Sequence, residues 1–209
     1  DWSSDVCSSD LFHDLFPTTV FIDNIGRDLT EDEMNVAYLH ARPENRVEAA
    51  TNYLSKDRNI FENHHNELLS IKEFINKNVR TYIDEVLSPP PGLEFYYTNS
   101  WFTFDEPGQE HRPHVHQNCI LCGTFYFAAD KSQDRIDFIN FSKYKQIWWQ
   151  ETNVNRRNEE ATSFFVGSGD MTIFPPHLYH AVPKVTSKNT RICMPFNRSE
   201  EHTSELQSH

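Results

Sequence analysis

The feature that most constrains this chain is a succession of short β-like runs in its C-terminal half. From Leu93 onward these runs are separated by turn residues, among them Glu106-Pro107-Gly108 and Gly167-Ser168-Gly169-Asp170. The runs are LEFYYTNSWFTF, CILCGTFYFAA, RIDFINF, TSFFVG, DMTIFPP, HAVPKV and TRICMPF. Short aromatic and β-branched strands that follow a helical lead-in are typical of a jelly roll. We therefore predict a mostly β fold with α-helices (α+β), a double-stranded β-helix or jelly roll backed by N-terminal helices.

The N-terminal part supplies those helices after one short strand, PTTVFID (17–23). Thr30 and Glu33 have the spacing of a capping box, which predicts a helix from there to about Ala41. Residues 61–87 carry apolar side chains at helical spacing and are followed by SPPPG (88–92), which ends a helix. We expect this longer helix to pack against the sheet.

Composition excludes several classes of protein. The chain has 209 residues, of which 37% are hydrophobic and 13% aromatic, too many for a disordered chain. Its net charge of −12 disfavours binding to nucleic-acid phosphates. No run of apolar residues reaches the length of a membrane-spanning helix, so we expect no membrane partner.

The two ends differ from the rest. Residues 1–11 and 198–209 are polar, rich in serine and acidic residues, and without periodicity. They resemble translated sequencing-adapter sequence of the kind found in metagenomic genes, and the alternative is a pair of disordered native tails. We therefore place the folded domain at residues 12–197.

The cysteines indicate a reducing compartment. Once Cys7 is set aside with the N-terminal segment, Cys119, Cys122 and Cys193 remain, and an odd number suits no disulfide framework. With no visible signal peptide, we expect a cytoplasmic location. Cys119 and Cys122 are three residues apart in a predicted strand and would face opposite sides of it. We therefore interpret them as small buried side chains, not as a metal pair.

Three histidines are the main candidates for chemistry. His114 and His116 have i, i+2 spacing, so at the start of a strand both imidazoles would lie on one face, together with Asn118. His180 follows a Gly-Asp turn, a strand and two prolines, which would carry it to the mouth of the roll. Three ligands on one side of an ion leave positions open for other molecules, as in non-haem Fe(II) sites. We expect His111 and His177 to lie outside this set.

Arg191 is a candidate for binding an anion beside the metal. It lies eleven residues after His180, and a hairpin between them would bring both to the inner face. A guanidinium there can grip a carboxylate with two hydrogen bonds. An open metal position with an arginine beside it is suited to a 2-oxo acid.

Two stretches, SWFTFDEPGQEHRPHVHQNCILCGTFYF (100–127) and GDMTIFPPHLYHAVPKVTSKNTRICMPFN (169–197), resemble the 2-oxoglutarate/Fe(II)-dependent oxygenase superfamily. The resemblance is strongest to the oxygenases common in phages and marine bacteria. It implies a bound Fe(II), 2-oxoglutarate as cosubstrate, and oxidative decarboxylation coupled to oxidation of a C–H bond in a further substrate. If the gene is phage-encoded, the location would be the host cytoplasm.

The resemblance also assigns residues. It implies that His114, His116 and His180 hold the metal and that Arg191 binds the cosubstrate carboxylate. Tyr126 and Asn118, which have the inward parity, are candidates to hydrogen-bond the cosubstrate.

The chain departs from the superfamily pattern at one ligand. His116 stands where a carboxylate is usual. Either the site has three histidines, or His116 is the first ligand and a carboxylate comes from elsewhere. The candidates for that carboxylate are Asp105, Glu106 and Glu110.

Two other functions remain open from the sequence. Gly169, Asp170, His177 and His180 resemble the second motif of a cupin, which would give a metal-dependent dioxygenase that does not use 2-oxoglutarate; the glutamate of the first cupin motif is absent. A non-enzymatic metal-binding phage protein is the other. Residues 142–160 form a long insertion that we expect to shape the substrate entrance. The sequence does not name the substrate or the oligomeric state.

Overall fold

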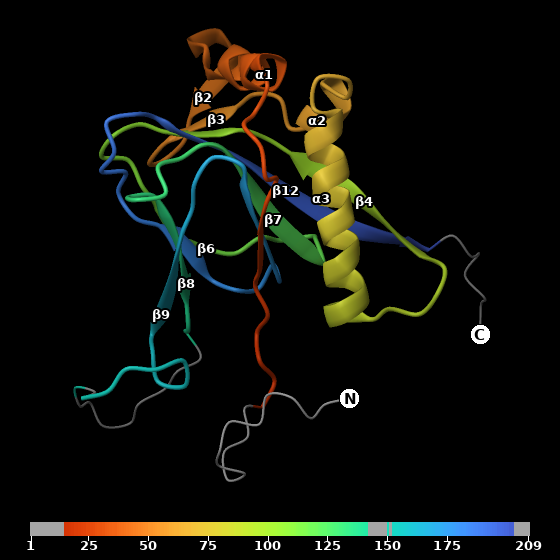
Figure 1. The fold of residues 1–209 in the computed structure, drawn as a ribbon, viewed down its shortest axis with the longest axis vertical. Coiled ribbons are helices and arrows are strands. Elements are labelled where there is room, and N and C mark those ends of the chain that lie inside the picture. The colour runs from red at the N-terminus through yellow and green to blue at the C-terminus, as the bar shows by residue number, and fades with distance from the viewer. Residues whose placement is uncertain (1–14, 142–149, 151, 203–209) are drawn as a thin grey trace.

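The computed structural model describes residues 15–141, 150 and 152–202. Helix α3 (Leu69–Tyr82) lies across one face of an eight-stranded antiparallel sheet, and a four-stranded sheet lies on the other side (Figure 1). The larger sheet has the order β1-β10-β7-β12-β5-β3-β2, with β4 also paired to β12, and the smaller one has the order β6-β11-β8-β9. This arrangement confirms the predicted mostly β jelly roll with helices on its outer face.

The strands of the larger sheet are β1 (Phe21–Asn24), β2 (Arg46–Glu48), β3 (Tyr53–Ser55), β4 (Leu93–Ser100), β5 (Thr103–Asp105), β7 (Leu121–Ala128), β10 (Asp170–Phe174) and β12 (Arg191–His202). Those of the smaller sheet are β6 (His111–His114), β8 (Arg135–Ile139), β9 (Ala161–Phe165) and β11 (His180–Val182). The other elements are α1 (Glu31–Ala41), α2 (Ile60–Asn63), a 3-10 turn (Pro43–Asn45) and a π-helical turn (Ile83–Leu87) that continues α3. Within the described residues, no helix combines the length and the apolar character needed to cross a bilayer.

The helical predictions are confirmed in part. The capping box at the start of α1 forms, because the Thr30 side chain accepts a hydrogen bond from the Glu33 N–H and the Glu33 carboxylate accepts one from the Thr30 N–H. The helix expected over residues 61–87 is interrupted. Its first turn is the separate helix α2, after which residues 64–68 form a turn before α3 begins. The Asn63 side chain donates back to Asp57 at 3.0 Å, an alternative bonding pattern that Asn and Asp favour at such breaks.

Side-chain alternation in the central strands places the site. In β7, Phe125 and Phe127 belong to the core against α3, whereas Cys122 and Tyr126 belong to the core between the two sheets. Strand β12 alternates in the same way. The apolar side of each strand therefore anchors the sheet on α3, and the other side is available to the space between the sheets.

The C-terminal boundary expected at residue 197 falls inside a strand. Strand β12 runs to His202, because residues 198–202 pair with β4. Arg198 is buried and donates hydrogen bonds to the Asn76 side chain (3.0 Å) and to the Phe95 carbonyl (2.9 Å). At least this part of the segment 198–209 is therefore not a disordered tail. Residues 1–11 lie outside the described residues, and the adapter origin of both ends stays a prediction.

The predicted burial is confirmed for Cys122, whereas Cys119 is only partly buried, and the predicted geometry of the pair is wrong. Strand β7 begins at Leu121, so Cys119 lies in the preceding turn, next to Asn118 with its φ of 57°. Both Cys119 and Cys122 pack against the same apolar cluster. Burial raises the pKa of each thiol, and the Cys122 Sγ donates to the Phe174 carbonyl at 3.4 Å. All three cysteines in the described ranges are free.

Candidate metal centre and cosubstrate cavity

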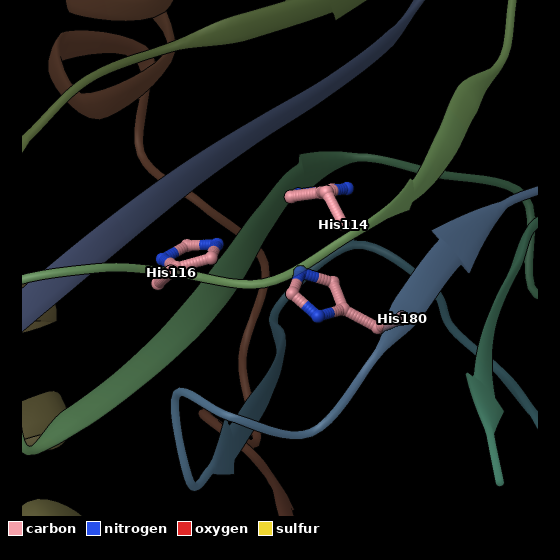
Figure 2. Close-up of side chains that lie close together, drawn as sticks. All are labelled: His114, His116 and His180. Carbon is pink, nitrogen blue, oxygen red and sulfur yellow. The ribbon is translucent and has the colours of Figure 1, made fainter. Parts of the chain in front are cut away.

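Three imidazoles meet in the space between the sheets (Figure 2). His114 ends β6, His180 begins β11, and the two are direct partners in the strand register. His116 lies just beyond β6, in an extended segment whose N–H donates to the Pro176 carbonyl at 3.0 Å. One ring nitrogen of each histidine lies within 4.8 Å of the others. The predicted trio is therefore assembled, although His116 lies outside the strand in which it was expected.

The second nitrogen of each ring fixes its tautomer. Nδ1 of His114 lies 2.8 Å from the Arg112 carbonyl oxygen, and Nδ1 of His180 lies 3.0 Å from the Leu178 carbonyl oxygen. Nδ1 of His116 lies 2.5 Å from Oδ1 of Asn197. These oxygens only accept, so each Nδ1 carries the proton and each Nε2 keeps its lone pair. This is the state in which an imidazole binds a metal, and outer hydrogen bonds of this kind orient metal ligands.

Electrostatics keep the three rings neutral. Burial lowers the pKa of His116, and burial with the neighbouring imidazoles lowers that of His114. For His180, burial and the adjacent His114 lower the pKa to about 3. Protons therefore compete weakly with a cation for these nitrogens near neutral pH. The donor set, three neutral imidazoles, suits a divalent transition-metal ion.

A buried ion pair lies at the other end of the site. Arg191 and Asp105 face each other on β12 and β5, and their side chains are 2% and 0% exposed. Nη2 and Nε of Arg191 donate to Oδ2 of Asp105 at 2.6 and 3.2 Å. Burial opposes the charged form of Asp105, yet the hydrogen bond from His111 and the charge of Arg191 prevail and lower its pKa. The other oxygen, Oδ1, lies 2.8 Å from Nε2 of His111 and 3.1 Å from Nδ2 of Asn52.

A cavity of about 300 Å³ connects the two groups. Its lining includes the three histidines, Arg191, Tyr126 and the β2–β3 hairpin residues 49–52. His180 and Arg191 reach it from different sheets, so the predicted hairpin between them is wrong. Strand β12 forms its backbone hydrogen bonds with β4, β5 and β7, which are distant in the sequence, and not with β11.

Of the remaining candidate residues, some line the cavity and others are exposed outside it. Tyr126 is in the cavity wall, and burial raises the pKa of its hydroxyl. Asn118 is exposed in a left-handed turn outside this lining, so it does not share the inner face with the histidines. His177 is exposed, as expected. Trp101 also lines the cavity, with its ring centroid 6.0 Å from that of His116.

The carboxylate alternatives find no support. Asp105 is bonded to Arg191, His111 and Asn52, and Glu106 pairs with Arg46 at 3.2 Å. In the ranges that the structure describes, neither these two nor Glu110 falls within the ligand group around the three histidines. Part of the insertion at residues 142–160, which we expect to shape the substrate entrance, lies outside the described residues, namely 142–149 and 151.

Sequence reasoning missed the residues that support the site. Asn197 accepts the hydrogen bond that orients His116. It lies six residues after Arg191 in β12, and this even spacing, which places both side chains on one face of the strand, could have indicated it. Asp105 and Asn52 gave no such signal, because they reach Arg191 and His111 through strand pairs distant in sequence. His111 lies outside the ligand group, as expected, and lines the cavity.

The jelly roll thus brings three imidazoles with free ring nitrogens and a buried arginine into one cavity, which makes this cavity a candidate metal centre. Residues 99–197 match the family model described as "Putative 2OG-Fe(II) oxygenase". This match confirms the predicted resemblance to the 2-oxoglutarate/Fe(II)-dependent oxygenases over this part of the chain. A search of curated proteins found no match.

Solved structures share the fold at low sequence identity. The carbocyclase SnoK from nogalamycin biosynthesis is 13% identical with a TM-score of 0.59, over 91% of this chain and 84% of that one. A prolyl-4-hydroxylase from Pseudomonas putida is 12% identical with a TM-score of 0.53, over 87% and 93%. HygX from Streptomyces hygroscopicus, solved with nickel and 2-oxoglutarate, is 9% identical with a TM-score of 0.52, over 87% and 83%.

Proposed function

We propose that this protein is a 2-oxoglutarate- and Fe(II)-dependent dioxygenase whose metal ligands are His114, His116 and His180. The observation that carries this assignment is the set of three imidazoles with ring nitrogens within 4.8 Å of one another, each ring bonded to an oxygen through Nδ1. When bound, the iron and cosubstrate supply oxidative decarboxylation coupled to oxidation of a C–H bond, with hydroxylation as the usual outcome. The protein supplies orientation and exclusion of water.

Arg191 binds the distal carboxylate of the cosubstrate in this proposal. The guanidinium already donates hydrogen bonds from Nε and Nη2 to Asp105. Its other N–H groups are therefore the ones that can bind an anion. Asp105 holds the guanidinium plane in place and, by offsetting its charge, limits the affinity to what an exchangeable cosubstrate requires. Tyr126 lies in the same wall and offers a phenolic O–H to the cosubstrate.

Three neutral ligands give this centre a different charge from the superfamily pattern. With three neutral imidazoles and no protein carboxylate among its ligands, a bound Fe(II) would carry its full 2+ charge. The 1-carboxylate of 2-oxoglutarate would supply the negative charge that Asp or Glu gives elsewhere. We expect iron binding to be strongly coupled to cosubstrate binding as a result.

The test is an anaerobic titration of the apoprotein with Fe(II) and 2-oxoglutarate, followed by the visible metal-to-ligand charge-transfer band. The unaltered chain should develop the band, His180→Ala should abolish it, and Arg191→Lys should shift its midpoint to higher 2-oxoglutarate because lysine cannot form the fork. His177→Ala, an exposed histidine three residues away, is the matched control. A band of full strength in His180→Ala would refute the ligand assignment.

The cupin alternative predicts substrate turnover that is independent of 2-oxoglutarate, and the non-enzymatic alternative predicts metal binding without succinate formation from any substrate. Measurement of succinate with and without candidate substrates separates all three functions. The substrate itself, the phage origin and the cytoplasmic location remain predictions, the last in keeping with the free thiols.

A further inference from the structure

A second group of metal-ligating side chains lies away from the cavity. It consists of His40 in the last turn of α1, Asp57 in the loop after β3, and His64 at the end of α2. Ligand atoms of the three lie within 4.8 Å of one another. His40 is only 7% exposed, and its ring stacks on Phe102 with centroids 5.7 Å apart. The cavity lining includes none of these three residues.

The two imidazoles face each other through their Nε2 atoms, which are 2.9 Å apart. Two imidazole nitrogens bound to one Zn²⁺ at about 2.0–2.1 Å would be about 2.8–3.4 Å apart for angles between about 90° and the tetrahedral angle. The observed spacing is thus within a few tenths of an ångström of that needed for joint ligation. In the absence of an ion, one of the two nitrogens must carry a proton for this contact to be attractive.

Without an ion, one ring nitrogen of His40 lacks a hydrogen-bond partner within the part of the chain that the structure describes. Its Nδ1 is buried and has no hydrogen-bond partner among the described residues. Burial and the neighbouring His64 lower the pKa of His40. A cation on Nε2 gives this buried ring a stronger partner than a second imidazole does.

The carboxylate of the group is held in position. Oδ1 of Asp57 accepts a hydrogen bond from the Asn59 N–H at 2.8 Å, and Oδ2 accepts one from the Asn63 side chain at 3.0 Å. Hydrogen bonds of this kind orient metal ligands and leave each oxygen a lone pair for an ion. The group therefore has two imidazoles, one oriented carboxylate and a partly exposed side from which water can complete the coordination.

We propose that His40, Asp57 and His64 form a second, structural metal site that binds Zn²⁺ and joins α1 to the loop after β3 and to the end of α2. Two nitrogen ligands, one oxygen ligand and one water give the four-coordinate geometry that Zn²⁺ accepts. The inference does not depend on the oxygenase assignment, because none of the three residues takes part in it.

The position of this site links it to the cavity mechanically. The Ser55 hydroxyl donates to the Asp57 carbonyl at 2.7 Å and accepts the Phe102 N–H at 2.9 Å. Strand β3, which ends at Ser55, pairs with β5, the strand that carries Asp105. An ion at Asp57 would therefore stabilise the hairpin that closes one wall of the cavity.

The experiment uses the full chain with His114→Ala and His180→Ala, which removes the first centre and leaves the second intact. Co²⁺ is the spectroscopic probe, followed by its visible absorption, and Zn²⁺ is the competitor. We expect one equivalent of Co²⁺ to bind, to be displaced by Zn²⁺, and Zn²⁺ to raise the thermal unfolding midpoint. Adding His64→Ala or the isosteric Asp57→Asn should weaken binding by at least about tenfold.

His65→Ala is the matched control, since His65 is exposed and adjacent but outside the ligand group. In the otherwise unaltered chain, equilibrium dialysis should give two Zn²⁺ per chain, falling to one with His64→Ala and staying at two with His65→Ala; this arm applies even if the double variant does not fold. Equal Zn²⁺ stoichiometry and affinity in His64→Ala and His65→Ala would overturn the proposal. Loss of the charge-transfer band with retained Zn²⁺ binding at this site would instead count against the oxygenase assignment alone.

Discussion

The carboxylate of Asp105 accepts two hydrogen bonds from the guanidinium of Arg191, at 2.6 and 3.2 Å, with both side chains almost completely buried. The two residues are partners in the β5–β12 register, so the pair is set by strand pairing and not by loop conformation. A charged group that is fixed in this way presents its free N–H groups in one direction only. His111 bonds to the same carboxylate and lies with its ring centroid 6.0 Å from that of His114, so it connects this pair to the three histidines.

Asp105→Asn should destabilise the protein by about 3 kcal/mol, because it leaves the Arg191 charge buried without its counter-charge. It should also raise the KM for 2-oxoglutarate, since the guanidinium loses its fixed orientation. Urea unfolding and steady-state succinate formation measure the two effects. Glu106→Gln, the next residue, removes a partly exposed pair with Arg46 and should cost no more than about 1 kcal/mol. Similar losses in both variants would contradict this account of the pair.

Asn197→Ala should weaken metal binding by about 10- to 100-fold without unfolding the protein, because His116 loses the acceptor that fixes its tautomer and ring orientation. Isothermal titration with Fe(II) under anaerobic conditions measures the change. Asn118→Gly is the control, since Asn118 is exposed at a positive φ and lies outside the cavity lining. An unchanged affinity in Asn197→Ala would show that His116 needs no support from β12.

Gly123→Ala should cost about 3 kcal/mol or more, because the added methyl group would overlap the Phe196 ring and the Thr172 carbonyl in the centre of the larger sheet. Gly26→Ala tests a different cause, as its Cβ would meet nothing within 4 Å but its φ is +75°. That substitution should cost about 1–2 kcal/mol through backbone strain alone. The denaturant concentrations at the unfolding midpoints give the order of stability of the two variants. A larger loss in Gly26→Ala than in Gly123→Ala would refute the packing argument at Gly123.

The apoprotein should lose stability as the pH falls below about 6.5. The pKa of His180 is lowered to about 3 in the folded state, so between these values the unfolded chain binds the extra proton and folding stability rises with pH. His180 alone contributes a slope of up to about 1.4 kcal/mol per pH unit in this window. Urea unfolding of the unaltered chain and of His180→Gln from pH 4 to 7 isolates this contribution. Parallel pH profiles for the two proteins would exclude it.

Local sequence signals predicted the local structure well. The capping box at Thr30 and the turn-bounded runs that became β7, β8 and β10 depend only on neighbours in the chain, and the structure confirms them. The i, i+2 spacing of His114 and His116 and the position of His180 likewise brought the three imidazoles together, even though the strand ended at His114.

Two kinds of relation failed: strand pairing between distant segments, and side-chain alternation at one irregular backbone position. The hairpin expected between His180 and Arg191 does not form, because β12 finds its partners in β4, β5 and β7, which no spacing along the chain reveals. The inward parity expected of Asn118 is lost at a left-handed residue that breaks the alternation before β7. Strand pairing also explains the interpretation of Asp105 as a possible metal ligand: its partner is the guanidinium of Arg191, which is 86 positions away in the sequence.

The three Nδ1 hydrogen bonds differ in one respect that bears on how the centre can be altered. His114 and His180 donate to carbonyls two residues earlier in their own segments, and no substitution removes a main-chain oxygen. His116 relies on a side chain 81 residues away. Mutation can therefore adjust the electron donation of only one imidazole from outside the ligand set, so position 197 is where evolution or engineering could tune this metal's reactivity while its other two attachments stay constant.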